Sequence, residues 1–175
     1  IALIEGLVSE DPKTLKPIPG VAESWDISED GLLYTFHLRK NAKWSNGDPV
    51  TAHDFVYSYR RILNPNLASQ YASMLHGLKN ARKYHEEGLK WEDAKVGAVA
   101  IDNYTLQLTL ENPTPYFLEL LNHYSWFPAH PPTIKKFDAF EKQGTSWTRP
   151  GNYVGNGPFI LSEHKVNSVI EVKKN

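Results

Sequence analysis

The stretch "KWSNGDPVTAHDFVYSYRR", residues 43–61, combines a tight-turn signal with a helix start. Asn46 and Gly47 both tolerate a positive φ, so this pair favours a tight turn. Thr51 and Asp54 then have the spacing of a capping box, in which each side chain binds the backbone amide of the other residue. The stretch therefore predicts a tight turn followed by a capped helix N-terminus. This is a structural role and not that of a reaction site.

The histidines form no recognisable catalytic or metal-binding motif. His53 lies beside Asp54 but is expected to point outward from the first helical turn. His85 precedes two glutamates, yet a second histidine one turn away, which a helical zinc pair requires, is missing. We therefore expect no catalytic residue, no metal and no cofactor. Of the remaining histidines, His37 lies on the outer face of its strand. His123 and His130 lack an obvious carboxylate partner, and His76 and His164 are isolated.

The bulk composition restricts the class of protein. The chain has 175 residues, which is long enough for one domain or for a lobe of a larger one. Of these residues, 41% are hydrophobic and 22% are charged, which is ordinary for a soluble globular protein. The net charge is −1, and the basic pairs at 135–136 and 173–174 are too short to follow a phosphate backbone, so no nucleic-acid partner is expected. Cysteine is absent, which excludes disulfides and thiolate nucleophiles.

Hydrophobic periodicity indicates a mixture of strands and helices. Residues 32–39 and 104–110 alternate apolar and polar side chains, which is typical of strands with one buried face. Tyr71, Leu75 and Leu78 form an apolar stripe at helical spacing. The mixture has no regular βαβ rhythm and predicts an α+β fold. The other expected elements are a strand at 96–101 in a hairpin with 104–110, helices from about 51, over 69–79, after Thr114 and over 133–142, and a hairpin of 159–164 with 168–173.

Four stretches, taken in order, resemble one family of proteins. They are "IPGVAESW" (18–25), "YTFHLRKNAKWSNGDPVTAHDFVYSYRR" (34–61), "YTLQLTLENPTPYFLELL" (104–121) and "WTRPGNYVGNGPF" (147–159). Together they resemble the amino-terminal part of the extracytoplasmic solute-binding proteins of peptide ABC importers, of the oligopeptide-binding type. Members of this family are much longer, so the chain looks like an excised amino-terminal portion.

The resemblance implies a division of the chain. Residues 1–5 would end a first-lobe segment, and residues 6–129 would form the small lobe beside the ligand-binding lobes. Residues 130–175 would return into the first, incomplete binding lobe of a type II, peptide-binding, periplasmic-binding-protein-like fold. The Pro-rich stretch 127–133 is the best internal boundary in the sequence. The structural signature within these stretches would comprise Asn46, Gly47, Thr51, Asp54, Asn156 and Gly157.

The resemblance also implies a function without catalysis. An extended oligopeptide would be captured between closing lobes and delivered to ABC permease subunits, outside the cytoplasm, in the periplasm or from a lipid anchor on the outer face of the membrane. Tyr71 matches a family tyrosine that lines the peptide site, although Gln70 precedes it where an oligopeptide binder of the family has proline. The alternative is that Tyr71 only begins the core stripe. Contacts for the peptide termini would lie outside this chain, which we expect to be monomeric and to bind peptide weakly or not at all by itself.

Other functions stay open at the level of the sequence. The same fold would also suit a nickel chelate, haem or an oligosaccharide as cargo. A surface signalling or adhesion lipoprotein without transport would keep the scaffold but not the importer. A glycosidase would need two facing carboxylates, and 20 acidic residues make chance pairs inevitable without giving positive support.

Overall fold

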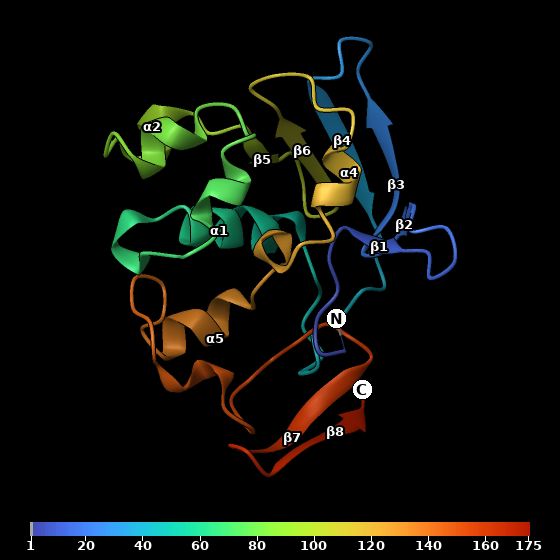
Figure 1. Ribbon diagram of the computed structural model, residues 1–175, viewed down its shortest axis with the longest axis vertical. Helices are drawn as coiled ribbons and strands as arrows, with labels where there is room; N and C mark the ends of the chain where they lie inside the picture. Colours follow the sequence, from blue (N-terminus) through green and yellow to red (C-terminus); the bar gives the residue numbers. More distant parts are fainter. Residues whose placement is uncertain (1) are drawn as a thin grey trace.

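The computed structural model describes residues 2–175 and contains a four-stranded antiparallel sheet (Figure 1). The strands are β3 (Ala22–Ile27), β4 (Leu33–Leu38), β6 (Thr105–Thr109) and β5 (Ala98–Ala100), in the spatial order β3-β4-β6-β5. Every neighbouring pair runs antiparallel. The helices lie between and after these strands in the chain, so the predicted α+β class is confirmed.

The alternation in β4 and β6 places one apolar row in the core. Tyr34, Phe36 and Leu38 of β4 are buried, whereas the residues between them are partly exposed. Phe36 lies opposite Leu106 of β6 in the register of the two strands. The expected hairpin of 96–101 with 104–110 is present as β5 and β6. Both periodic stretches were therefore predicted correctly as strands with one buried face.

Short helices cover the sheet and extend the core. The longest, α1 (Ala52–Ile62), packs against β5 and β6. Helix α5 (Pro131–Lys136) and the 3₁₀ helix η3 (Tyr124–Trp126) lie against α1 in turn (Figure 1). Within residues 2–175, no helix has the length and apolar character of a membrane span. The remaining helical elements are η1 (Pro65–Leu67), η2 (Ala72–Leu75), α2 (Ala81–His85), α3 (Trp91–Ala94), α4 (Phe117–Leu120) and η4 (Ser146–Thr148).

Helix α1 begins directly after Thr51, at the capping box that the sequence predicts. Asp54 accepts a hydrogen bond from the Thr51 backbone N–H at 2.9 Å, and the two residues form a capping box. Trp44, which is buried, donates its indole N–H to the same carboxylate oxygen at 3.0 Å. Burial raises the pKa of Asp54, and these two hydrogen bonds act in the opposite sense. One carboxylate therefore fixes the helix start to the preceding turn.

The tight turn before α1 is linked to a distant part of the chain. Gly47 has a φ of +92°, and the Asn46 side chain donates to Asp48 at 2.7 Å. Asp48 also bonds Nε2 of the buried His130 at 2.9 Å. The expectation that His130 lacks a carboxylate partner is therefore wrong, because its partner is 82 positions away in the sequence.

The pKa of Asp48 lies below its usual range, first because of the Asn46 hydrogen bond and then because of His130. A carboxyl group whose pKa is lower in the folded state than in the unfolded state, where it is about 3.9, stabilises the fold at pH values above the unfolded-state pKa. This contribution is lost as the pH falls through the folded-state pKa. We expect Asp48→Asn to be less stable than the wild type at about pH 7 and to lose most of that deficit near pH 2. Urea unfolding at both pH values measures the deficit, and an equal deficit at both would contradict this linkage.

The prediction of a helix over residues 69–79 is wrong. Only the short 3₁₀ helix η2 forms there, and the backbone that follows it joins the sheet instead. Leu78 forms a β-bridge with Leu110, and the Lys79 N–H binds the Thr109 carbonyl at 2.9 Å. An α-helix would use these backbone groups internally, so pairing with the sheet replaces the helix.

Two other expected helices are shorter than predicted. Helix α4 begins only at Phe117, and the Thr114 hydroxyl donates to the Asn112 carbonyl at 3.0 Å instead of capping the helix. Helix α5 starts earlier than predicted and ends at Lys136, after which Asp138 adopts a φ of +50°. A residue in the left-handed region does not continue an α-helix, so the predicted extension is wrong.

The first residues of the chain are bound to a segment near its end. The Asn156 side chain accepts from the Glu5 N–H at 2.9 Å and donates to the Glu5 carbonyl at 3.0 Å. The Gly157 N–H binds the Leu3 carbonyl at 3.1 Å. A Cβ on Gly157 would lie 2.5 Å from Ile4 N, so the two backbones approach more closely than any side chain permits.

Two small two-stranded sheets complete the fold. Strand β1 (Val8–Glu10) pairs with β2 (Pro17–Pro19). Strand β7 (Phe159–Lys165) pairs with β8 (Val169–Lys174), as expected for a hairpin at this end of the chain. The β7-β8 hairpin lies apart from the four-stranded sheet, beyond α5 (Figure 1).

The division into 1–5, 6–129 and 130–175 stays a prediction. Residues after 129 make several contacts with the segment around α1: the Arg61 side chain donates to the Ala139 carbonyl at 2.9 Å. The first residues of the chain, by contrast, contact the segment just before β7. The first set of contacts crosses the proposed boundary at 129–130, whereas the second joins two segments that the division assigns to the same lobe.

Candidate functional site

Tyr71 lies at the surface in a small group of aromatic rings. The residue is 39% exposed, and its ring lies 5.3 Å from that of His123 and 5.5 Å from that of Tyr124, measured between centroids. His123 stacks on Tyr124 at 4.2 Å. The alternative that Tyr71 only begins a buried stripe is wrong, because Leu75 and Leu78 are buried and Tyr71 is not. We refer to Tyr71, His123 and Tyr124 as the aromatic cluster.

Two 3₁₀ helices position the aromatic cluster. Tyr71 directly precedes η2, whose Ala72 and Leu75 are buried, and η2 packs against η3. His123 directly precedes η3, and its Nδ1 accepts from the Ser125 N–H at 3.3 Å. A neutral histidine that accepts at Nδ1 carries its proton on Nε2, so Nε2 stays available as a donor.

The aromatic cluster offers apolar faces and polar edges but no activated nucleophile. Two phenolic hydroxyls and one imidazole N–H provide hydrogen bonds, and the rings provide apolar contact area. The pKa of Tyr124 is raised, first by partial desolvation and then by a hydrogen bond with Tyr71, so its phenol stays protonated near neutral pH. Such a surface suits a ligand that presents polar and apolar groups along one chain.

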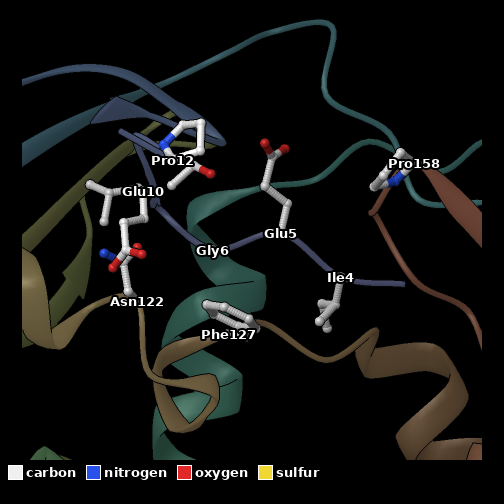
Figure 2. A pocket seen from close by; sticks show the side chains of 10 residues that line it. Ile4, Glu5, Gly6, Glu10, Pro12, Asn122, Phe127 and Pro158 are labelled. Atoms are coloured by element: carbon white, nitrogen blue, oxygen red, sulfur yellow. The ribbon is translucent and has the colours of Figure 1, made fainter. Parts of the chain in front are cut away.

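A cavity of about 400 Å³ opens next to the first residues of the chain (Figure 2). Glu5, Phe127 and Asn122 line it, and Asn122 directly precedes His123 of the aromatic cluster. Among residues 2–175, the Asn122 Nδ2 atom is buried without a hydrogen-bond partner. Glu5 is exposed as a residue, yet desolvation around its carboxyl group raises its pKa, against the effect of Arg39. The lining of the cavity therefore combines a carboxyl group with an aromatic ring, whereas the Asn122 Nδ2 atom is buried and does not face a ligand there.

The residues expected as a structural signature lie at a turn, at a helix start and where two segments of the chain meet. None of them belongs to the aromatic cluster as defined above. His53 is exposed in the first turn of α1. The signature residues are Asn46, Gly47, Thr51, Asp54, Asn156 and Gly157.

Reasoning from the sequence missed the partners of Tyr71 and one histidine pair. His123 and Tyr124 reach Tyr71 only because η2 and η3 pack together, and no local motif marks this contact. His76 was expected to be isolated, but its Nε2 lies 2.8 Å from His85 Nδ1, so that expectation is wrong. Nine positions separate the two histidines, which is not a helical spacing.

The sequence matches known proteins over almost its full length. The family model described as bacterial extracellular solute-binding proteins, family 5 Middle, matches residues 16–175. The periplasmic oligopeptide-binding protein OppA of Escherichia coli is 47% identical over 98% of this chain. The OppA of Haemophilus influenzae is 42% identical over 99% of this chain. The chain spans 30% and 31% of the lengths of these two relatives.

Solved structures share the fold. The crystal structure of Haemophilus influenzae OppA in complex with RPPGFSPFR matches with a TM-score of 0.89 and 42% identity, covering 99% of this chain and 32% of that one. A periplasmic oligopeptide-binding protein from Borrelia burgdorferi matches with a TM-score of 0.90 and 38% identity, covering 99% and 33%. This chain therefore belongs to family 5 of the bacterial extracellular solute-binding proteins.

Proposed function

We propose that this chain is part of the substrate-binding component of an ABC importer, which captures extended oligopeptides between closing lobes and delivers them to a membrane permease. The observation that carries the proposal is the exposed aromatic cluster, in a chain whose relatives are named oligopeptide-binding proteins. The Haemophilus influenzae relative was solved with RPPGFSPFR, a peptide of mixed apolar, polar and charged residues. A ligand of that kind needs a surface that tolerates different side chains.

The aromatic cluster would hold a peptide without demanding one sequence. Its ring faces would take apolar side chains, and its hydroxyls and the His123 Nε2–H would bind main-chain groups, which every peptide has. A peptide leaving the cluster would next meet the cavity that Asn122, one residue earlier in the chain, helps to line. Main-chain hydrogen bonds of this kind give affinity, and roomy side-chain contacts give breadth.

The proposed role includes binding and release but no bond breaking. The cluster offers hydroxyls and an imidazole without the nucleophile, base and orienting group that covalent catalysis needs. We further propose that the protein acts outside the cytoplasm, in the periplasm or with a lipid anchor on the outer face of the membrane, and that the chain is monomeric. The relatives named periplasmic support this placement.

Replacing Tyr71 with alanine is expected to weaken peptide binding about five- to tenfold, because one face of the aromatic cluster is lost. The experiment uses the full-length protein and the peptide RPPGFSPFR in calorimetric titration. Tyr71→Phe keeps the ring and should retain most of the affinity, which separates ring contact from the hydroxyl. Failure of the wild-type full-length protein to bind this or other oligopeptides would overturn the proposed function.

Tyr116→Ala is the matched control for this experiment. Tyr116 is 61% exposed and precedes α4, so it resembles Tyr71 in residue type and in its position before a short helix. It is not part of the aromatic cluster, and its removal should leave the affinity within about twofold of the wild type. Equal affinity of Tyr71→Ala and the wild type would remove Tyr71 from the binding surface and leave only the family-level proposal.

A further inference from the structure

Two histidines and a glutamate meet on the surface formed by η2 and α2. His76 Nε2 lies 2.8 Å from His85 Nδ1, and His76 Nδ1 lies 3.7 Å from Glu86 Oε1. The His76 side chain is only 9% exposed, whereas that of Glu86 is 49% exposed. One nitrogen from each imidazole and one carboxylate oxygen lie within 4.8 Å of one another. The group therefore consists of metal-ligating atoms, with one nearly buried member and one open side.

Backbone contacts hold the two histidines in place. His76 ends η2 as its C-cap residue, and His85 is the last residue of α2. Between them, Leu78 forms a β-bridge with Leu110, which directly follows strand β6, and the Asn80 N–H binds the Glu111 carboxylate at 2.9 Å. The connection is thus fixed to the sheet at its middle, which turns the two ends toward each other.

We propose that His76, His85 and Glu86 form a binding site for a single Zn²⁺ ion, with water at the remaining position. Two imidazole nitrogens and one carboxylate oxygen are among the ligand sets that Zn²⁺ takes in proteins, and three protein ligands with one open position make an exchangeable site. The proposal concerns a site separate from the aromatic cluster and does not depend on the proposed function.

The geometry needs only a small adjustment. With bonds of about 2.0–2.1 Å, tetrahedral zinc ligands lie about 3.4 Å apart. The ligand atoms of the three residues, all within 4.8 Å of one another, would shift by about 1 Å to reach that spacing. His85 is half-exposed and Glu86 exposed, so both are free to make this movement.

Burial and the neighbouring charges have opposing effects on His76 and on a bound cation. Burial is the main reason that the pKa of His76 lies below its usual value, and Glu86 acts in the opposite sense. A metal ion requires the unprotonated imidazole. Arg82 opposes a cation, but it lies 3.6 Å from the second oxygen, Oε2, and leaves Oε1 toward His76. Glu87 and Glu111 line the adjacent cavity together with Arg82 and Lys83, so the charges of its lining balance.

The test is calorimetric titration of Zn²⁺ into the untagged full chain after treatment with a chelator, with Co²⁺ absorption as a second readout. We expect one ion per chain, and Co²⁺ bands of the tetrahedral type. His85→Gln and His76→Gln should each weaken binding by at least about 100-fold, and Glu86→Gln by about tenfold. His164→Gln, at an exposed position on β7, should leave the affinity unchanged within about twofold.

Several outcomes would overturn the proposal. Absence of Zn²⁺ binding by the wild type would reduce the group to a histidine–histidine hydrogen bond. Equal binding by the wild type and His85→Gln would place any bound ion elsewhere. His76 is nearly buried, so its variant needs a circular dichroism check, but His85 and Glu86 are more exposed and provide independent tests. Peptide titration of the same variants in the full-length protein reports separately on the proposed function.

Discussion

Replacing Gly157 with alanine is expected to lower the free energy of unfolding by about 3 kcal/mol. A Cβ at this position would lie 2.5 Å from Ile4 N and 2.6 Å from the Leu3 carbonyl carbon, which are both backbone atoms without a rotamer to change. The overlap is relieved only if the two segments separate, which also breaks the hydrogen bond between Gly157 N–H and the Leu3 carbonyl. Urea unfolding followed by tryptophan fluorescence measures the loss.

Two other glycines make this prediction specific. Gly155→Ala should have a similar effect, because its Cβ would lie 2.0 Å from the Leu3 carbonyl oxygen. Gly77→Ala is the control: its Cβ position has no heavy atom within 4 Å, and the change should be neutral or stabilising by about 0.5 kcal/mol. If Gly157→Ala proves as stable as the wild type, and the Glu5 amide keeps its protection from exchange, the close approach is not a constraint.

The residues around Gly157 show what a single sequence reveals. The letters "GNG" at 155–157 are a turn signal on local grounds, and only the family resemblance marked Asn156 and Gly157 as structural. Their partners, Leu3 to Glu5, lie about 150 positions away, as the Asn156–Glu5 hydrogen bonds show with a separation of 151. Hydrophobic periodicity cannot predict a contact between residues so far apart in the sequence. The structural reason for a glycine at position 157 is therefore evident only from the folded structure.

Local signals predicted the elements that are stabilised locally. The capping box of Thr51 and Asp54 and the alternation of β4 and β6 depend on residues within a few positions, and these elements formed where expected. The prediction of a helix over 69–79 failed for the opposite reason, since the backbone there pairs with Thr109 at the end of β6 and with Leu110 directly after it, about 30 positions later. The aromatic cluster and the pair of His76 and His85 likewise required the packed structure.

Replacing Asp54 with alanine is expected to lower the free energy of unfolding by about 2–4 kcal/mol. The change removes the acceptor of the Thr51 N–H at 2.9 Å and of the Trp44 indole N–H at 3.0 Å. Trp44 is 2% exposed, so its N–H would stay buried without a partner, which costs more than the loss of an exposed hydrogen bond. Chemical unfolding measures the loss.

Two further variants, Asp93→Ala and Asp54→Asn, separate the helix-dipole effect from the lost hydrogen bonds in the destabilisation caused by Asp54→Ala. Asp93 occupies the same third position in helix α3 but is exposed, so its variant measures the helix-dipole effect alone, about 0.5 kcal/mol. Asp54→Asn keeps an acceptor oxygen and removes a charge that burial disfavours, as the raised pKa of Asp54 indicates. A raised folded-state pKa gives stability that is present below the unfolded pKa and is lost as the pH rises through the folded value. Asp54→Asn should therefore lose less than half as much stability as Asp54→Ala at neutral pH, and equal losses in all three variants would mean that Asp54 acts only through the helix dipole.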